Sequence, residues 1–319
     1  MDYSQILSQQ FNIKEEYAKN IITLLDDGNT IPFIARYRKE MHGSMDDQLI
    51  REFAEKLEYL RGLDKRRDEI RSLIDAQEKL TDEINLALDK AATLSELEDI
   101  YRPYRPKRKT RASIAKEKGL EPLANDILKQ EKGFDPSKSA VDYIDEEKGV
   151  TSVEDAIQGA MDIIAELVSD NAEIRKRIRN LTNANGVLVS VATDEEKDSV
   201  YKNYYDYKEP VKKIAGHRVL AVNRGEKEGF LKVSVETDSE KPLNSIFRAM
   251  ITDKNQLCSD IIREACTDAY QRLIYPSIER EVRNDLTDTA SENAMKVFAV
   301  NLKQLLMQPP VKGKNRACT

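Results

Sequence analysis

The stretch SVEDAIQGAMDIIAELVSDNAEIRKRIRNLTNANG, residues 152–186, decides the fold class because it predicts two consecutive helices. Ser152, followed three residues later by Asp155, is a helix-start signal. Apolar residues then recur at helical spacing, at positions 156, 157, 160, 164 and 167. Asp170 is the predicted cap of a second, basic helix over 174–181, which ends near Gly186. This part of the chain is therefore expected to be helical.

Toward the N-terminus the same signals repeat. A helix-capping residue precedes each of four further runs of helical periodicity, at Asn12, Ser44, Thr81 and Thr93. The last of these forms a capping-box pattern with Glu96, and the first run stops where Gly28 follows it. The N-terminal half is therefore predicted to be a multi-helix domain.

Toward the C-terminus the pattern is mixed. Residues 187–191 (VLVSV) fit either a short strand or a helix start. The segment 217–236 has strand character, with glycines bracketing a charged turn, and predicts a minor β element near 229–236. Two long helices follow, over 256–275 and 277–308, with a break at Pro276.

The predicted fold class is mainly α, a multi-helix N-terminal domain plus a helical central region with this minor β element. Charged residues make up 34% of the chain, with 12 glycines, 10 prolines and no tryptophan among 319 residues, which favours long solvated helices. The predicted domain limits are 1–186 for the first domain and 187–310 for the central region, with 311–319 as the start of a further, missing domain.

Few residues suited to catalysis or metal binding are present. The chain has two histidines and three cysteines, Cys258, Cys266 and Cys318, and the first two are expected to be buried or half-buried helix thiols. Nucleotide-binding, hydrolase and metalloprotease motifs are missing, so no enzyme activity and no cofactor are expected. The N-terminus lacks a signal peptide and no apolar run is long enough for a membrane span, so the cytoplasm is the default compartment.

One segment concentrates positive charge in an otherwise acidic chain. Residues 101–118 hold eight Lys or Arg and one Glu, a local charge of +7, whereas the net charge of the whole chain is −6. The densest part is IYRPYRPKRKTRA, residues 100–112, here called the basic segment. Its predicted nucleic-acid contacts are Arg102, Arg105, Lys107, Arg108, Lys109 and Arg111, with Tyr101 and Tyr104 between them.

Guanidinium and ammonium groups are the donors that phosphates need, and interleaved tyrosine rings can stack on unpaired bases. Two prolines in the basic segment, Pro103 and Pro106, prevent a continuous helix. The alternative interpretation is an exposed loop whose arginines pair with carboxylates of the same chain. For a charge run considered by itself, this alternative is the more frequent outcome.

Two further sets of basic residues are candidates for secondary contacts. In TIPFIARYRKEMHG, residues 30–43, Pro32, Phe33 and Ile34 are expected in the core and Tyr37 is expected to pack. The basic residues of this stretch are expected to face outward, and they are Arg36, Arg38 and Lys39. The second set consists of His217, Arg218 and Arg224, which are more typical of hydrogen-bonded structural groups than of a catalyst.

Four ordered segments carry a family resemblance. TIPFIARYRKE (30–40), LSELEDIYRPYRPKRKTRASIAKEKGLEPLA (94–124), HRVLAVNRGEKEGFLKV (217–233) and DAYQRLIYPSIEREVR (268–283) resemble the N-terminal half of the Tex transcription accessory proteins. The resemblance covers about residues 3–314. It implies a helical N-terminal domain and a helical central region in a nucleic-acid-binding, transcription-associated protein related to a eukaryotic elongation factor.

The resemblance also implies what such proteins contain beyond this region. They normally continue with an RNase-H-like YqgF domain, helix-hairpin-helix elements and an OB-fold RNA-binding domain. After PPVKGK this sequence reads NRACT and stops, so the YqgF domain and its acidic positions are expected to be missing. We interpret the sequence as a truncated or frame-shifted product, or as the product of a split gene.

The leading functional prediction is a helical fragment of a transcription accessory protein that binds RNA or DNA weakly and in a salt-dependent manner. The transcription machinery is the expected protein partner, and no membrane is expected. The alternative is a protein-interaction scaffold with no nucleic-acid binding of its own.

Overall fold

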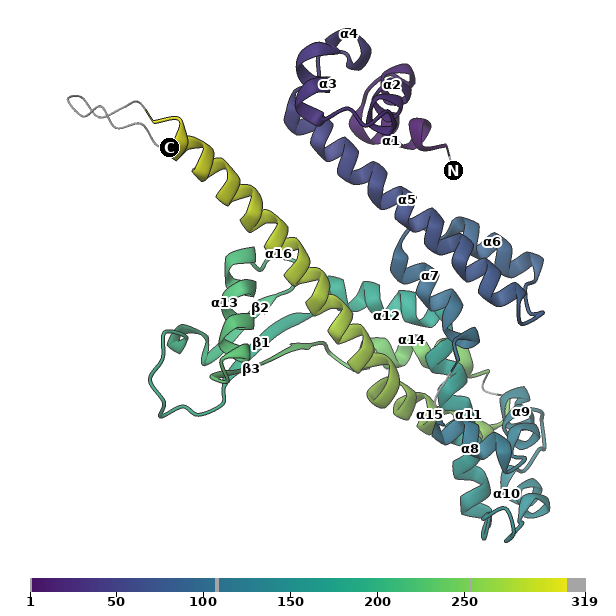
Figure 1. The fold of residues 1–319 in the computed structure, drawn as a ribbon. Helices are drawn as coiled ribbons and strands as arrows, with labels where there is room; N and C mark the ends of the chain where they lie inside the picture. The colour runs from purple at the N-terminus through teal and green to yellow at the C-terminus, as the bar shows by residue number, and fades with distance from the viewer. Residues whose placement is uncertain (1, 107–108, 253, 309–319) are drawn as a thin grey trace. The chain divides into compact units, whose positions relative to one another are not determined.

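A computed structural model of the chain describes residues 2–106, 109–252 and 254–308 (Figure 1). The chain forms two compact units, Met1–Pro106 and Lys107–Thr319. Both units are mainly helical, as predicted, and each contains hydrophobic cores of its own. The boundary between the units lies inside the basic segment. The domain limits expected at 186 and 310 remain predictions.

The first unit is built along one long helix, α5 (Figure 1). Its N-terminal half contributes Ile50, Phe53 and Leu57 to a core shared with the preceding helices. Its C-terminal half contributes Ile70 and Ile74 to a second core shared with the following helices. The elements of this unit are α1 (Tyr3–Phe11), α2 (Glu15–Asp26), α3 (Ile31–Tyr37), α4 (Lys39–His42), α5 (Asp47–Asp75), α6 (Asp82–Lys90), α7 (Leu94–Tyr101) and the 3₁₀ helix η1 (Arg102–Tyr104).

Several of these helices begin where the sequence predicts. The side chains of Thr81 and Thr93 accept hydrogen bonds from backbone N–H groups in the first turns of α6 and α7. Two predicted caps are wrong. Asp46, not Ser44, caps α5, and Asn12 ends α1 in a left-handed conformation instead of starting α2. Asn tolerates that conformation, which explains why the same residue type marks both helix ends.

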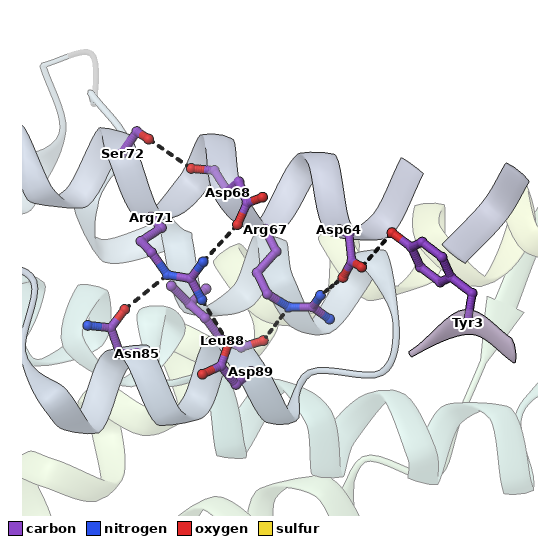
Figure 2. A network of polar contacts seen from close by, with 9 residues as sticks. All are labelled: Tyr3, Asp64, Arg67, Asp68, Arg71, Ser72, Asn85, Leu88 and Asp89. Carbon is purple, nitrogen blue, oxygen red and sulfur yellow. Dashed lines mark hydrogen bonds and ion pairs between the residues drawn. The ribbon is translucent and has the colours of Figure 1, made fainter. Parts of the chain in front are cut away.

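A polar network joins α5 to α6 inside the first unit (Figure 2). Arg67 is 4% exposed, and its guanidinium donates to the carbonyl oxygens of Leu88 at 2.8 Å and Ala91 at 3.0 Å. It also pairs with Asp64, whose carboxylate accepts a 2.7 Å bond from the Tyr3 hydroxyl. The carbonyls belong to the end of α6, so the buried cation satisfies a helix C-terminus.

The second unit is also mostly helical. Its elements are α8 (Arg111–Glu117), α9 (Glu121–Lys129), α10 (Pro136–Ala140), η2 (Val141–Tyr143), α11 (Val153–Asp170), α12 (Ala172–Asn185), β1 (Val187–Ala192), η3 (Lys202–Tyr204), β2 (Asp206–Pro210), α13 (Gly216–Lys227), β3 (Leu231–Glu236), α14 (Glu240–Met250), α15 (Gln256–Asp268), η4 (Ala269–Ile274) and α16 (Tyr275–Leu306). The two helices that the opening stretch predicts are α11 and α12. Ser152 caps α11 as expected, whereas α12 is capped by Asn171 in place of Asp170.

A three-stranded antiparallel sheet lies in the second unit, in the order β2-β1-β3. Residues 187–191 are therefore a strand, and the predicted β element near 229–236 is confirmed as β3. The first half of the segment with strand character is instead helical, as α13. Gly216 at its start lies against Ala290 of α16, where an added Cβ would be 3.2 Å from the Ala290 Cα. This close helix contact stabilises a helix that local propensity does not favour.

The C-terminal helical segments α15, η4 and α16 follow one another without a break. The predicted break at Pro276 is wrong, because the π-helical segment η4 leads directly into α16 with Pro276 in its first turn. Pro276 has no backbone N–H to donate, and it directly follows the π-helical turn in which the Tyr275 N–H donates to the Tyr270 carbonyl oxygen, so the regular α-helical bonding pattern is already altered there. Beyond Ala290 no described residue of α16 is buried, and this end of the helix extends away from the sheet and α13 (Figure 1).

Candidate nucleic-acid interface

The basic segment connects the two units. Its first part completes α7 and continues through η1, whereas Arg111 begins α8 of the second unit. Lys107 and Arg108, two of its predicted contacts, lie outside the described residues.

The tyrosines anchor the first end. Tyr101 is 6% exposed and belongs to the core formed by α5, α6 and α7. Tyr104 packs against the same core, and its carbonyl oxygen accepts a 2.9 Å hydrogen bond from Gln77. The buried ring of Tyr101 has no free face for a base, so this residue is a core anchor instead of the predicted stacking contact. A large aromatic side chain gains most of its stabilisation from burial, which explains this placement.

Capping interactions anchor the second end. The Thr110 and Ser113 side chains each accept a hydrogen bond from the other's backbone N–H, which forms a capping box at the start of α8. The Thr110 hydroxyl also donates to Glu166 of α11 at 3.2 Å. Arg111, at the start of α8, is exposed, and its positive charge acts on Asp162 of α11. Burial raises the pKa of Asp162, and the positive charges of Arg272 and Arg111 oppose that rise.

The exposed cations of the basic segment have weak internal partners. The side chain of Arg105 is 62% exposed and lies 3.5 Å from Glu98, which is also bound by Arg66 at 2.7 Å. The side chain of Lys109 is 68% exposed and lies 3.5 Å from Glu117. Arg102 is half-buried and has an interaction within the protein. The alternative interpretation, pairing within the chain, therefore describes part of the segment.

Such ion pairs do not prevent phosphate binding. Exposed pairs contribute roughly 0–1 kcal/mol, and a separation of 3.5 Å is long for a charge-assisted hydrogen bond. Phosphate oxygens offer bidentate partners to a guanidinium at shorter distances. Arg105 and Lys109 can therefore exchange an internal carboxylate for a phosphate at little cost in stability.

The secondary basic residues differ in their surroundings. Arg36, Arg38 and Lys39 are all exposed, at the end of α3 and the start of α4. Ile34 is buried as expected and Phe33 is half-buried, but Pro32 is exposed. Tyr37 was expected to pack and is instead 66% exposed, because α3 buries Ile34 toward α2 and α5 and leaves the opposite side in solvent.

The set on α13 is structural. Arg218 donates to Glu209 of β2 at 2.8 Å, and Arg224 pairs with Glu228 at 2.9 Å. A hydrogen bond from Tyr207 and the adjacent Arg218 lower the pKa of Glu209. His217 is exposed beside them. Arg218 thus joins α13 to β2, which agrees with the structural interpretation made from the sequence, whereas the Arg224 pair is local to the end of α13.

The two cysteines that the structure describes are free thiols in the core of the second unit. Cys258 and Cys266 are buried on α15, as expected, and burial raises the pKa of Cys266 to about 12. Cys318 lies outside the described residues. Within the part of the chain that the structure describes, no group of three His, Cys, Asp or Glu side chains could hold a metal ion. Over the same residues, no helix combines the length and apolarity that crossing a bilayer requires.

Sequence reasoning missed two features. It did not single out Arg67, because a buried arginine on a charged helix has no signal apart from its i, i+3 spacing to Asp64. It also expected Tyr37 to pack, although the short run between Pro32 and Arg38 leaves room for few buried positions.

Two protein families match this sequence. One is described as Tex-like protein N-terminal domain and matches residues 1–75. The other is described as Tex central region-like and matches residues 131–298, which is more than half of the chain.

Three relatives show how far the similarity extends. A Bacillus subtilis protein named Uncharacterized protein YdcI is 44% identical over 98% of this chain and 45% of its own length. The Transcriptional accessory protein Tex of Neisseria gonorrhoeae is 36% identical over 97% of this chain and 42% of its own length. The human S1 RNA-binding domain-containing protein 1 is 31% identical over 98% of this chain and 33% of its own length. The chain therefore spans less than half the length of each of these relatives.

Proposed function

The chain belongs to the Tex family, and on that premise we propose that it is a non-catalytic, helical part of a transcription accessory protein that binds nucleic acid through the basic segment. One relative is named as a transcriptional accessory protein and another as an S1 RNA-binding domain-containing protein. RNA or DNA is the proposed ligand, and the transcription machinery is the proposed setting.

One observation carries this proposal. The described cations of the basic segment include two side chains, Arg105 and Lys109, that are more than 60% exposed and held by ion pairs of 3.5 Å. Both ends of the segment are fixed, by the buried Tyr101 and by the capping box at Thr110. Arg105 and Lys109 each lie beside one of these anchored ends, so each presents its cation from a backbone that the neighbouring helix holds.

The test is fluorescence anisotropy with labelled single-stranded RNA and duplex DNA over a series of salt concentrations. The wild type is compared with a variant that carries Arg105→Glu, Lys107→Glu, Arg108→Glu and Arg111→Glu. We expect micromolar binding by the wild type, with affinity falling on the order of a thousandfold between about 50 and 200 mM salt if six phosphates are contacted. The variant should lose this binding.

A matched control distinguishes the effect of the basic segment on binding from the effect of the net charge of the chain. It reverses four exposed lysines elsewhere in the second unit, with Lys132→Glu, Lys212→Glu, Lys241→Glu and Lys254→Glu. This control has the same net charge as the test variant and should keep most of the wild-type affinity. Equal losses in both variants, or no binding by the wild type at low salt, would show that the basic segment is structural. Metal-dependent nuclease activity in the purified chain would contradict the non-catalytic assignment.

A second candidate function is a protein-interaction scaffold that does not bind nucleic acid. The observation in its favour is the end of α16, where apolar side chains are largely exposed, namely Met295, Val297, Phe298, Val300, Leu302, Leu305 and Leu306. Apolar exposure on this scale is typical of interaction surfaces. Light scattering that shows a clean monomer, together with no binding of a hydrophobic dye, would count against this candidate.

A further inference from the structure

An exposed aromatic ring marks a separate surface on the first unit. Tyr37 is 66% exposed at the end of α3, and its ring centroid lies 5.3 Å from that of Phe33, one helical turn earlier. The guanidinium carbon of Arg38 lies 5.5 Å from the Phe33 centroid. The Arg38 guanidinium, the Phe33 ring and the Tyr37 ring therefore form a small cluster, in which the two rings are tilted by 40° and Tyr37 has most of its surface in solvent.

The charge around this ring is positive and uncompensated. Arg36, Arg38 and Lys39 are exposed, and the described part of the chain provides no carboxylate partner for any of them. Glu40 is the single acidic residue between positions 28 and 45, so the local charge is three minus one, or +2. Arg105 and Lys109 of the basic segment differ in this respect, because each has a carboxylate neighbour.

The corner between α3 and α4 that carries these residues is held in place. The buried His42 ring hydrogen-bonds through Nε2 to the carbonyl oxygen of Ile34 at 3.1 Å. Asn20 of α2 donates to the carbonyl oxygen of Met41 at 3.1 Å. Gly43 has a φ of +65° and lies directly against the Tyr17 ring, where a side chain would collide. The backbone that carries this exposed cluster is thus held in place by contacts within the first unit.

We propose that Tyr37, Arg36, Arg38 and Lys39 form a contact site for single-stranded nucleic acid, in which an unpaired base stacks on Tyr37 and the cations bind the adjacent phosphates. This inference rests on the proposed function and adds the form of the ligand to it. Aromatic rings among cations are the recurrent means of binding single strands without sequence preference. A duplex keeps its bases stacked inside, so it gains the phosphate contacts but not the stacking contact.

The test measures the anisotropy of a labelled single-stranded oligonucleotide and of a duplex with the full chain at low salt, as RNA and as DNA. Tyr37→Ala should weaken single-strand binding on the order of tenfold and leave duplex binding within about twofold. Tyr37→Phe should retain wild-type affinity, because it keeps the aromatic face. The matched control is Tyr59→Ala, an exposed tyrosine on α5 that also has a lysine, Lys56, over its ring.

The outcomes separate this inference from the proposed function. Wild-type binding of single strands that Tyr37→Ala leaves unchanged would overturn the inference and leave the basic segment as the proposed site. A loss of single-strand and duplex binding to the same extent would also overturn it. A wild type that binds neither ligand would reject both proposals. Selective loss of single-strand binding in Tyr37→Ala, absent in Tyr59→Ala, would support the site.

Discussion

The arginines of this chain fall into two groups according to what their guanidinium groups contact. Arg67, Arg175 and Arg179 are buried, and their partners lie on other helical segments or at helix ends. Arg36 and Arg105 are exposed. Arg36 has no carboxylate partner among the described residues, and Arg105 has an ion pair of 3.5 Å with Glu98. A buried cation must be paired because its desolvation is costly, so the first group stabilises the fold and the second remains available to ligands.

At this scale, replacing Arg67 should destabilise the first unit. Arg67→Met removes the guanidinium donor from the carbonyl oxygens of Leu88 and Ala91 and removes one partner of Asp64. Figure 2 shows the contacts of Arg67 with Leu88 and Asp64. Breaking a buried charge network in this way costs about 3 kcal/mol of the free energy of unfolding. Chemical denaturation of the wild type and the variant measures the difference.

The matched control for this prediction lies one helical turn further along α5. Arg71 is more exposed and bonds to Asp68, Asn85 and Asp89. Because these partners are reached by water, Arg71→Met should cost less than about 1 kcal/mol. Equal destabilisation by the two substitutions would show that burial does not determine the contribution of Arg67.

At the scale of elements, α16 is a helix with two different halves. Ile278, Val282 and Ala290 are buried, and Arg283 bonds to Glu226 of α13 and to the carbonyl oxygen of Val233. The half that follows has no buried residue in the described structure. Helical segments of about 12–15 residues without tertiary packing are marginal in water, so the two halves must differ in stability.

Hydrogen exchange should show this difference directly. Amides in residues 275–290 should be protected by the global stability of the second unit, whereas amides beyond about 295 should exchange within seconds. Exchange followed by mass spectrometry of peptides from each half provides the measurement. Strong protection of the outer half would mean that its apolar side chains are covered in solution, for example by a second copy of the chain.

The elements were predictable where local chemistry determines them. Thr93 and Ser152 cap helices as predicted because capping depends on nearby backbone groups. The helix at α13 was not predictable, since its stability depends on the contact of Gly216 with Ala290 from a distant segment. The role of Tyr101 was missed for the same reason, because only the packing of α5, α6 and α7 shows that its ring is buried.

At the scale of the whole molecule, the two units have separate cores and the basic segment is the connection between them. Their stabilities should therefore respond separately to substitutions. In Arg67→Met, core amides of α5 should exchange faster by a factor that matches the loss in stability, while amides of α11 and β1 remain unchanged. The same exchange experiment tests this, and faster exchange in both units would show that they unfold together.

Much of the candidate site could be predicted from the sequence, because residues 101–118 contain eight lysines and arginines in an otherwise acidic chain. Which of these cations are available could not be predicted. Availability depends on carboxylates such as Glu98 and Glu117, whose distances are set by the folded helices. For the surface around Tyr37, the sequence predicted the exposed cations but not the exposed ring, because the exposure of Tyr37 depends on how α3 packs in the folded unit.

The π-helical segment before α16 has a consequence for how this protein can change over evolution. A π-helical turn contains one residue more than an α-helical turn, so the loss of one residue from η4 would either close this segment into a regular α-helix or rotate α16 by about 100°. With that rotation, Arg283 would turn away from Glu226, and Ala290 would turn away from Gly216. Lineages of this protein should therefore tolerate substitutions within 269–274 more readily than insertions or deletions, because the number of residues there fixes the rotational phase of the helix that follows.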